Sequence, residues 1–154
     1  MMKIDRRIPH FTVFLVSVCL AVMLVASGCV VKLTSGYDEV TDKAVTELQQ
    51  KTETHLATLE SVVGLPECTY ENHKQFYDQA KTDINAIAAR AAAIPKNSII
   101  TKEIALLSSN LDNFEKLHKI SCLSTDQITL LRSHFDTSYT AIHKQLEFAK
   151  RGGT

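Results

Sequence analysis

The chain has 154 residues and carries 17 basic and 17 acidic side chains, so its formal net charge at neutral pH is zero. The two signs are interspersed and tryptophan is absent. These features exclude the basic patch, and argue against the aromatic stacking platform, that nucleic-acid-binding proteins use.

The first residues have the pattern of a secretory signal. Three basic side chains, Lys3, Arg6 and Arg7, precede an almost wholly apolar run over residues 11–26. A basic start, an apolar stretch and small residues at its end are typical of a secretory signal. Counted through Val31, the apolar run is also about long enough to cross a membrane as a helix. An uncleaved membrane anchor and ordinary secretion are therefore the competing interpretations.

The end of this run, Ala-Ser-Gly-Cys at residues 26–29, resembles the lipobox of bacterial lipoproteins. The resemblance implies cleavage before Cys29 and lipidation of its thiol. Two or three acyl chains suffice for stable anchoring in a bilayer. The match departs from the commonest pattern by having Ala26, not leucine, three residues before the cysteine. Val30 replaces the aspartate that retains such proteins at the inner membrane, which implies the outer membrane, facing the periplasm, if the source is Gram-negative.

We therefore expect a removed signal peptide over 1–28, a lipidated tether over 29–35 and a folded domain over 36–154. The mature part retains 14 basic and 16 acidic residues, a formal charge of −2. Its 126 residues suit one domain.

Apolar residues recur at helical spacing in four segments of the mature chain. In chain order these residues are Val45, Leu48, Thr52, Leu56, Leu59 and Val63; Tyr77, Ala80, Ile84, Ile87, Ala91 and Ile94; Ile100, Ile104, Leu107, Leu111 and Phe114; and Ile128, Leu131, Phe135, Ile142 and Leu146.

Capping and breaking residues predict where these helices begin and end. Ser35, with Asp38 three residues later, precedes the first helix, and Thr69 can cap the second. The third helix is expected to start within residues 98–101 and to end near Ile120. The predicted helix breakers are Gly64 to Pro66, Pro95 and Gly152-Gly153, and Ser124 with Gln127 forms a capping box before the fourth helix.

No segment alternates with the period of a β-strand over a useful length, so the domain is predicted to be all-α. Four amphipathic helices with short connections favour an up-down-up-down four-helix bundle. A three-helix arrangement with one long helix folded back is the alternative.

Cysteine usage predicts one disulfide. Cys19 leaves with the signal and Cys29 takes the lipid, which leaves Cys68 and Cys122. Thiols in an oxidising envelope compartment are expected to pair. In the predicted bundle both cysteines lie in loops at the same end, whereas the lipid, the Pro95 turn and the C-terminus lie at the other.

A zinc site is the chemical alternative at that end. Cys68, His73, His118 and Cys122 have a spacing similar to that of zinc ligands. The competing interpretation is an oxidised cysteine pair with ordinary histidines, because a histidine such as His118 is favoured near a helix C-terminus. We expect the disulfide, and therefore no metal and no cofactor.

Other candidate chemistry has little support. Glu115 and His118 form a single Glu-x-x-His step, whereas di-iron bundles need this step on two helices. His55 is expected to be a partly exposed polar residue at the edge of the first apolar stripe. Nucleophile elbows, phosphate-binding loops and His-Glu-x-x-His motifs are absent from the sequence, so no enzyme activity is expected.

The mature segments SGYDEVTDKAVTELQ (35–49), CTYENHKQFY (68–77), AAAIPKNSI (91–99) and KLHKISCLSTDQI (116–128) resemble a group of small bacterial lipoproteins that have no assigned activity. The resemblance implies a lipoprotein with a helical domain and implies no particular function.

The expected function is that of a non-enzymatic, membrane-anchored lipoprotein of the cell envelope. Its disulfide-stapled bundle is expected to bind another envelope protein, with no nucleic-acid partner. One alternative is a periplasmic carrier or sensor for a small ligand or metal. The other is a phage- or plasmid-type exclusion lipoprotein.

Lipidation of Cys29 predicts that cells fed labelled palmitate incorporate the label into the wild-type protein and not into a Cys29→Ser variant. Label and membrane fractionation are measured together. Equal labelling of the two proteins would contradict the anchor.

Overall fold

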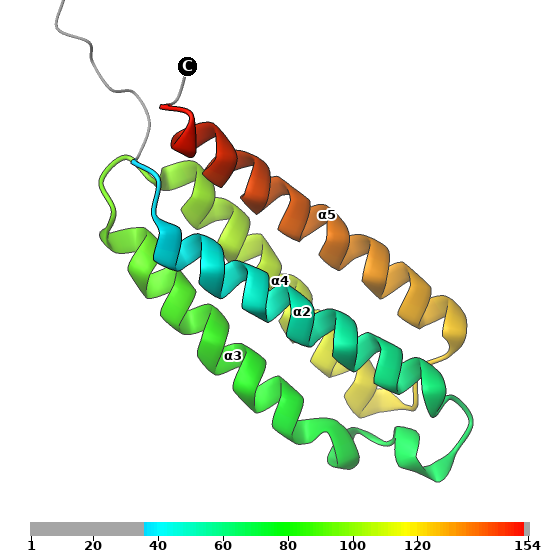
Figure 1. Cartoon of the computed structure of the whole chain (residues 1–154). Coiled ribbons are helices and arrows are strands. Elements are labelled where there is room, and N and C mark those ends of the chain that lie inside the picture. The colour runs from blue at the N-terminus through cyan, green and yellow to red at the C-terminus, as the bar shows by residue number, and fades with distance from the viewer. Residues whose placement is uncertain (1–35, 153–154) are drawn as a thin grey trace, which may run out of the picture. The chain divides into compact units, whose positions relative to one another are not determined.

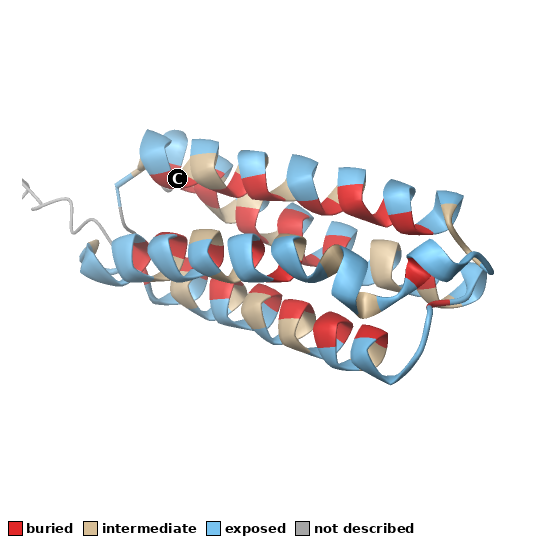
Figure 2. Ribbon diagram, turned by 90° about the horizontal axis from the view of Figure 1, so that it is seen from below, coloured by how far each residue is buried: buried red, intermediate tan, exposed pale blue. Residues whose placement is uncertain are grey.

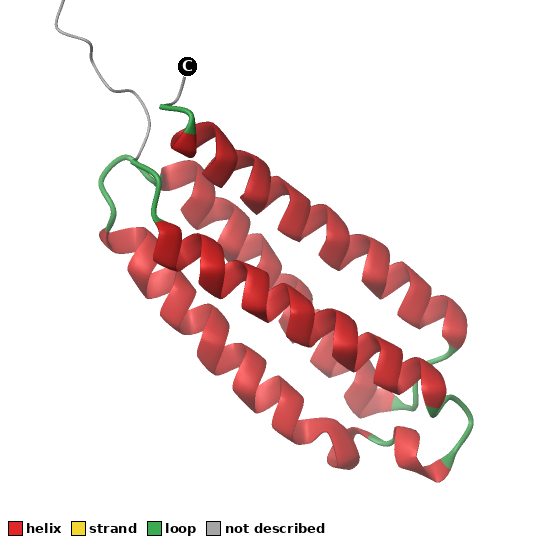
Figure 3. Ribbon diagram, viewed as in Figure 1, coloured by secondary structure: helices red, strands yellow, loops and turns green. Residues whose placement is uncertain are grey.

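A computed structural model describes residues 36–152, which form four long helices joined by short loops (Figures 1 and 3). The helices are α2 (Glu39–Ser61), α3 (Tyr70–Ala93), α4 (Ser98–Ile120) and α5 (Thr125–Lys150), with one short 3-10 helix, η1 (Pro66–Cys68), before α3. Within residues 36–152 there is no β-strand, so the all-α prediction is confirmed. The predicted signal peptide, Cys29 and the tether lie outside the described residues.

Consecutive helices run antiparallel and form a closed ring. Helices α2 and α4 each pack against both α3 and α5 (Figure 1). This is the predicted up-down-up-down four-helix bundle. The alternative, three helices with one long helix folded back, is wrong.

The start of α2 is fixed by Asp38 rather than by the predicted cap, Ser35, which lies outside the described residues. One Asp38 carboxylate oxygen accepts hydrogen bonds from the backbone N–H of Thr41 at 3.0 Å and from its hydroxyl at 2.5 Å. Arg90, in the last turn of α3, donates to both carboxylate oxygens at 2.6 and 2.7 Å. These bonds hold the pKa of Asp38 well below its usual range, with Arg90 the largest cause. The helix cap is thus also a link between α2 and α3.

The connection from α2 to α3 differs in detail from the prediction. Helix α2 ends at Ser61, three residues before Gly64, whose φ of 78° favours glycine at this turn. Thr69 occupies the N-cap position of α3, as predicted. Its hydroxyl, however, accepts a hydrogen bond from the Asn72 side chain at 3.0 Å instead of capping a backbone N–H.

The remaining helix boundaries agree with the sequence pattern. Helix α3 ends two residues before Pro95. The predicted capping box is confirmed, because the Gln127 N–H donates to the Ser124 hydroxyl at 3.3 Å and the Ser124 N–H donates to the Gln127 side chain at 2.9 Å. Helix α5 ends at Lys150, and Gly152 follows with a φ of 87°.

The four apolar stripes meet in one core, with the buried positions facing inward (Figure 2). All predicted stripe residues are buried except Val63, Ile94 and Leu131, which are half-buried. The polar member of the first stripe, Thr52, is satisfied inside the core. Its hydroxyl donates to the Leu48 carbonyl at 2.9 Å and lies 2.9 Å from the Tyr139 hydroxyl.

The two ends of the bundle differ. At one end Cys68, in η1, and Cys122, in the α4–α5 loop, form a disulfide with their Cα atoms 5.3 Å apart. We call residues 62–69 and 121–124, together with the adjoining helix turns, the disulfide end. The start of α2, the α3–α4 loop and the end of α5 lie at the opposite end (Figure 1). Among the described helices, none combines the length and apolar character needed to span a bilayer.

Loss of the disulfide should destabilise the bundle. The bond closes a segment with a sequence separation of 54, for which the chain-entropy account gives about 4 kcal/mol. We expect dithiothreitol, or the double substitution Cys68→Ser and Cys122→Ser, to lower the melting temperature by well over 10 °C. The control is the double variant itself, whose melting should not respond to dithiothreitol. An unchanged melt of the wild type on reduction would contradict the prediction.

Candidate functional site at the disulfide end

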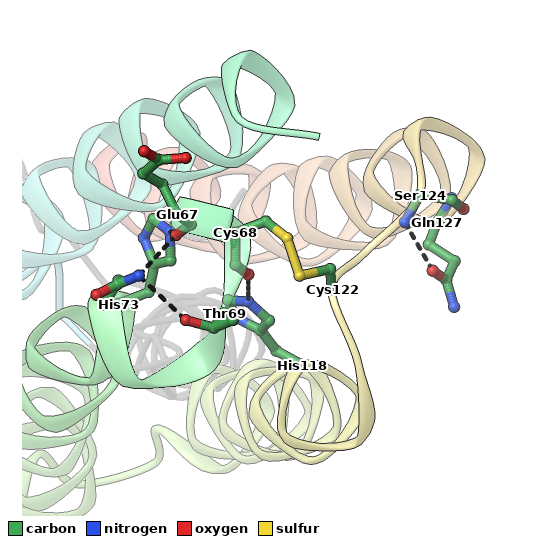
Figure 4. The surroundings of a disulfide bond; sticks show 9 residues. Glu67, Cys68, Thr69, His73, His118, Cys122, Ser124 and Gln127 are labelled. Atoms are coloured by element: carbon green, nitrogen blue, oxygen red, sulfur yellow. Dashed lines mark hydrogen bonds between the residues drawn. A yellow bond between two sulfur atoms is a disulfide. The ribbon is translucent and has the colours of Figure 1, made fainter. Parts of the chain in front are cut away.

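His118 links three segments at the disulfide end, and its bond to Cys68 is drawn in Figure 4. Its ring is 1 % exposed, with Nε2 lying 2.7 Å from the carbonyl oxygen of Cys68 and Nδ1 lying 2.7 Å from the hydroxyl of Tyr77. A carbonyl only accepts, so Nε2 carries a proton and donates it. In the neutral ring Nδ1 is then the acceptor, and Tyr77 donates to it.

This arrangement corrects the expectation that His118 is an ordinary residue near a helix C-terminus. The ring holds the backbone of η1 against α3 and α4, and both of its nitrogens are satisfied. Burial lowers the pKa of His118, although the bond to the Cys68 carbonyl opposes the shift. The neutral ring is therefore the stable form.

His55 is also buried, which corrects the expectation of partial exposure. It is 8 % exposed and stacks on Phe76, with ring centroids 3.7 Å apart and planes within 11°. Its Nε2 is buried and has no hydrogen-bond partner within the described residues. Burial, reinforced by His73 and His118, lowers the pKa of His55 to about 3. The ring is therefore neutral in the folded protein at pH 7.

His73 completes a cluster of three imidazoles. Its ring centroid lies 5.2 Å from that of His55 and 5.5 Å from that of His118. Its Nε2 is 3.1 Å from the Glu67 carbonyl (Figure 4). The structure thus brings His73 and His118 to the same end of the bundle as the two cysteines, as predicted.

These residues do not form a metal-ligand set. The disulfide uses both sulfurs, and the two nitrogens of His118 are engaged in hydrogen bonds. Within residues 36–152, no group of three or more His, Cys, Asp or Glu side chains has the arrangement of a metal site.

Glu115 is a buried carboxylate beside this cluster, where the sequence showed only a single Glu-x-x-His step. It accepts a hydrogen bond from the Tyr70 hydroxyl at 2.7 Å and is paired with Lys119 at 2.9 Å and with Lys81. Burial alone would raise the pKa of Glu115, but the bonds from the two lysines and the tyrosine outweigh it and lower the pKa to about 2. The group is a held carboxylate with a structural role and is not poised to take up a proton.

An open groove of about 640 Å³ lies between α2 and α3, next to the histidine cluster. His55 and Phe76 contribute its aromatic part, and most of its other side chains carry amides or hydroxyls. The sequence analysis missed this groove. A signal was present, because Gln50, Thr54 and Thr58 recur every fourth residue on α2 and form an uncharged polar stripe. The lining residues are Glu47, Gln50, Lys51, Thr54, His55, Thr58, Asn72, His73, Gln75, Phe76, Gln79 and Ala80.

The outer surface of the disulfide end combines apolar and acidic side chains. Ile120 is 80 % exposed and Leu65 is 49 % exposed. Among the described residues, the carboxylates of Glu67, Glu71 and Asp126 have no ion-pair partner. Glu67 lies in η1, and the other two lie in the first turns of α3 and α5.

Comparison of this chain with known protein families, curated proteins and solved structures found no match. The candidate site is therefore interpreted from its own geometry.

The buried histidines predict a loss of stability in mild acid. The pKa of His55 is about 3 in the folded protein and about 6.5 in an unfolded chain. The unfolded chain therefore takes up the proton first as the pH falls. The stabilisation is complete above pH 6.5 and is lost as the pH falls towards 3. His55 alone should cost about 2 kcal/mol between pH 7 and pH 5, and His118 shifts in the same direction.

Urea unfolding at pH 7 and pH 5 tests this prediction. The difference in unfolding free energy between the two pH values should shrink by about 2 kcal/mol in His55→Gln, which cannot titrate. It should keep its wild-type value in His134→Gln, because His134 is exposed on α5. A His55→Gln variant with the full wild-type difference would show that this ring is not the cause.

Proposed function

We propose that the chain is a lipid-anchored protein of the bacterial cell envelope that uses its disulfide end to bind another envelope protein. The observation that carries the proposal is the position of this end, opposite the start of α2 (Figure 1). A lipid on Cys29 would anchor the chain on the side of the start of α2, and the disulfide end would face away from the bilayer.

The dimensions set how far the disulfide end can reach from the lipid. Helix α3 has 24 residues, so the bundle is about 36 Å long. The segment from Cys29 to Asp38 spans at most about 32 Å when extended. A partner in the periplasm could therefore meet the disulfide end up to several tens of ångströms from the lipid.

The side chains at this end favour binding over catalysis. The nitrogens of His118 are both engaged, and Glu115 is held as a carboxylate by Lys81 and Lys119. These groups stabilise the end without remaining free for proton transfer. An exposed Ile120 at the same end as three unpaired carboxylates fits a partner surface that presents both basic and apolar side chains.

A site-specific photo-crosslinker tests the contact in cells that produce the full-length lipoprotein. Placed at residue 120 it should yield a discrete adduct with one envelope protein, whereas at residue 99 it should not. Ile99 is the matched control because it is 53 % exposed on the same helix, about 32 Å away at the other end.

The captured protein is then purified and its binding to the full chain is measured. Burial of an isoleucine contributes about 1.5–3 kcal/mol, so Ile120→Glu should weaken binding at least tenfold. Ile99→Glu should bind like the wild type. Unchanged binding of Ile120→Glu, or an adduct from residue 99 alone, would contradict the proposal.

A further inference from the structure

The groove between α2 and α3 offers hydrogen-bonding groups that the protein itself does not use. Within the described residues, the side-chain amides of Gln50 and Gln75 have no hydrogen-bond partner, and the side-chain oxygen of Asn72 accepts none. A primary amide has two donor protons and an acceptor oxygen. The buried His55, which also lines the groove, keeps one nitrogen without a partner.

The groove is close to neutral. Its lining has two fully charged side chains, Lys51 and Glu47. Lys51 forms an ion pair at 2.6 Å with Asp83, which lies outside the lining, and Glu47 lies beside Lys43. Phosphate and carboxylate ligands are usually held by arginine clusters. Among the described residues the lining has no arginine, and its two charged side chains have opposite signs, so its chemistry favours an uncharged ligand.

One aromatic surface lies among these amides. Phe76 is half-buried and stacks on the more deeply buried His55. Tyr77 lies edge-on to both rings, with centroids 5.6 Å from His55 and 5.2 Å from Phe76. The Phe76 ring is therefore held in a fixed orientation beside the polar side chains.

We propose that this groove binds an uncharged oligosaccharide. A pyranose ring presents hydroxyl groups around its edge and C–H groups on its faces. The hydroxyls match free amides, which both donate and accept, and the C–H face matches an aromatic ring. The volume of about 640 Å³ lies within the range of small-molecule sites.

A protein segment fits the groove less well. A docked helix needs an apolar strip along its length, and an extended peptide needs pockets for alternate side chains. The groove provides one aromatic ring and Ala80 as its wholly apolar side chains. Ile120 is not part of the groove lining, so this ligand goes beyond the proposed function.

Binding is tested with the full-length protein in a detergent that has no sugar headgroup. Neutral oligosaccharides, and the same chains oxidised to uronic acids, are titrated and followed by calorimetry. We expect a neutral oligosaccharide to bind with micromolar to millimolar affinity and its acidic counterpart to bind at least fivefold more weakly.

A filling substitution locates the site. Thr54 is exposed, lines the groove and donates its hydroxyl to the backbone four residues earlier. Thr129 on α5 is exposed and makes the same backbone bond, so it is the matched control. Thr54→Tyr should weaken binding at least tenfold, whereas Thr129→Tyr should leave it unchanged.

A second pair of variants tests the site if the Thr54→Tyr protein does not fold. Gln75→Ala removes one exposed amide and should weaken binding about fivefold, whereas Gln145→Ala on α5 should not. The proposal would be overturned if no neutral oligosaccharide bound at about 10 mM, which is about ten times the weakest dissociation constant expected. The proposal would also be overturned if Thr54→Tyr or Gln75→Ala bound the sugar as tightly as the wild type. The same holds if the acidic chains bound more tightly than the neutral ones, or if unrelated extended peptides displaced the sugar.

Discussion

The hydrogen bond from His118 to the Cys68 carbonyl is the interaction on which the organisation of the disulfide end depends. The disulfide joins the same residue, Cys68, to the loop that follows α4. The α2–α3 connection is thus joined to the end of α4 by two bonds. The disulfide uses the side chain of Cys68, and the hydrogen bond from His118 uses its backbone carbonyl. Tyr77 extends the link to the N-terminal third of α3. A short connection that would otherwise leave a buried carbonyl unsatisfied is thereby made part of the core.

Burial favours a neutral imidazole in this interaction, whereas its neighbour carries a charge. The neutral ring donates from Nε2 to the Cys68 carbonyl and accepts the Tyr77 hydroxyl proton at Nδ1. Glu115, three residues earlier on α4, remains ionised because Lys81 and Lys119 reach it from partly exposed positions. The same turn of α4 therefore combines a neutral polar network with an ion-pair network. Different causes set the two groups, since burial lowers the pKa of His118 whereas the bonds from the two lysines and Tyr70 lower the pKa of Glu115.

The sequence was sufficient to predict the fold because each helix carries its own periodic signal. The stripe from Ile100 to Phe114 is fully buried, and the Ser124–Gln127 capping box forms as the pattern indicated. The pairing of Cys68 with Cys122 was predicted from cysteine usage, and the topology permits it because antiparallel helices bring the two loops to one end. These inferences depend on local spacing and need no knowledge of which helix face meets which neighbour.

The burial of the histidines could not be predicted in the same way. His55 is buried because Phe76 from α3 covers it, and His118 because the carbonyl of Cys68 and the hydroxyl of Tyr77 satisfy it. Each of these partners belongs to another element, so the local sequence around the histidine does not indicate them. The start of α2 was misassigned for a related reason, since Asp38 is selected as the cap with help from Arg90 on α3.

The groove and the disulfide end are physically connected. The groove lies along the seam of α2 and α3, and the connection between these two helices is the segment that Cys122 and His118 hold in place. Its aromatic part, His55 with Phe76, packs against Tyr77, which donates to His118. The spacing of α2 and α3 beside the groove is therefore constrained by the same contacts that close the end of the bundle. Because the constraint is made before any ligand arrives, a ligand in the groove would not have to order the two helices in order to bind.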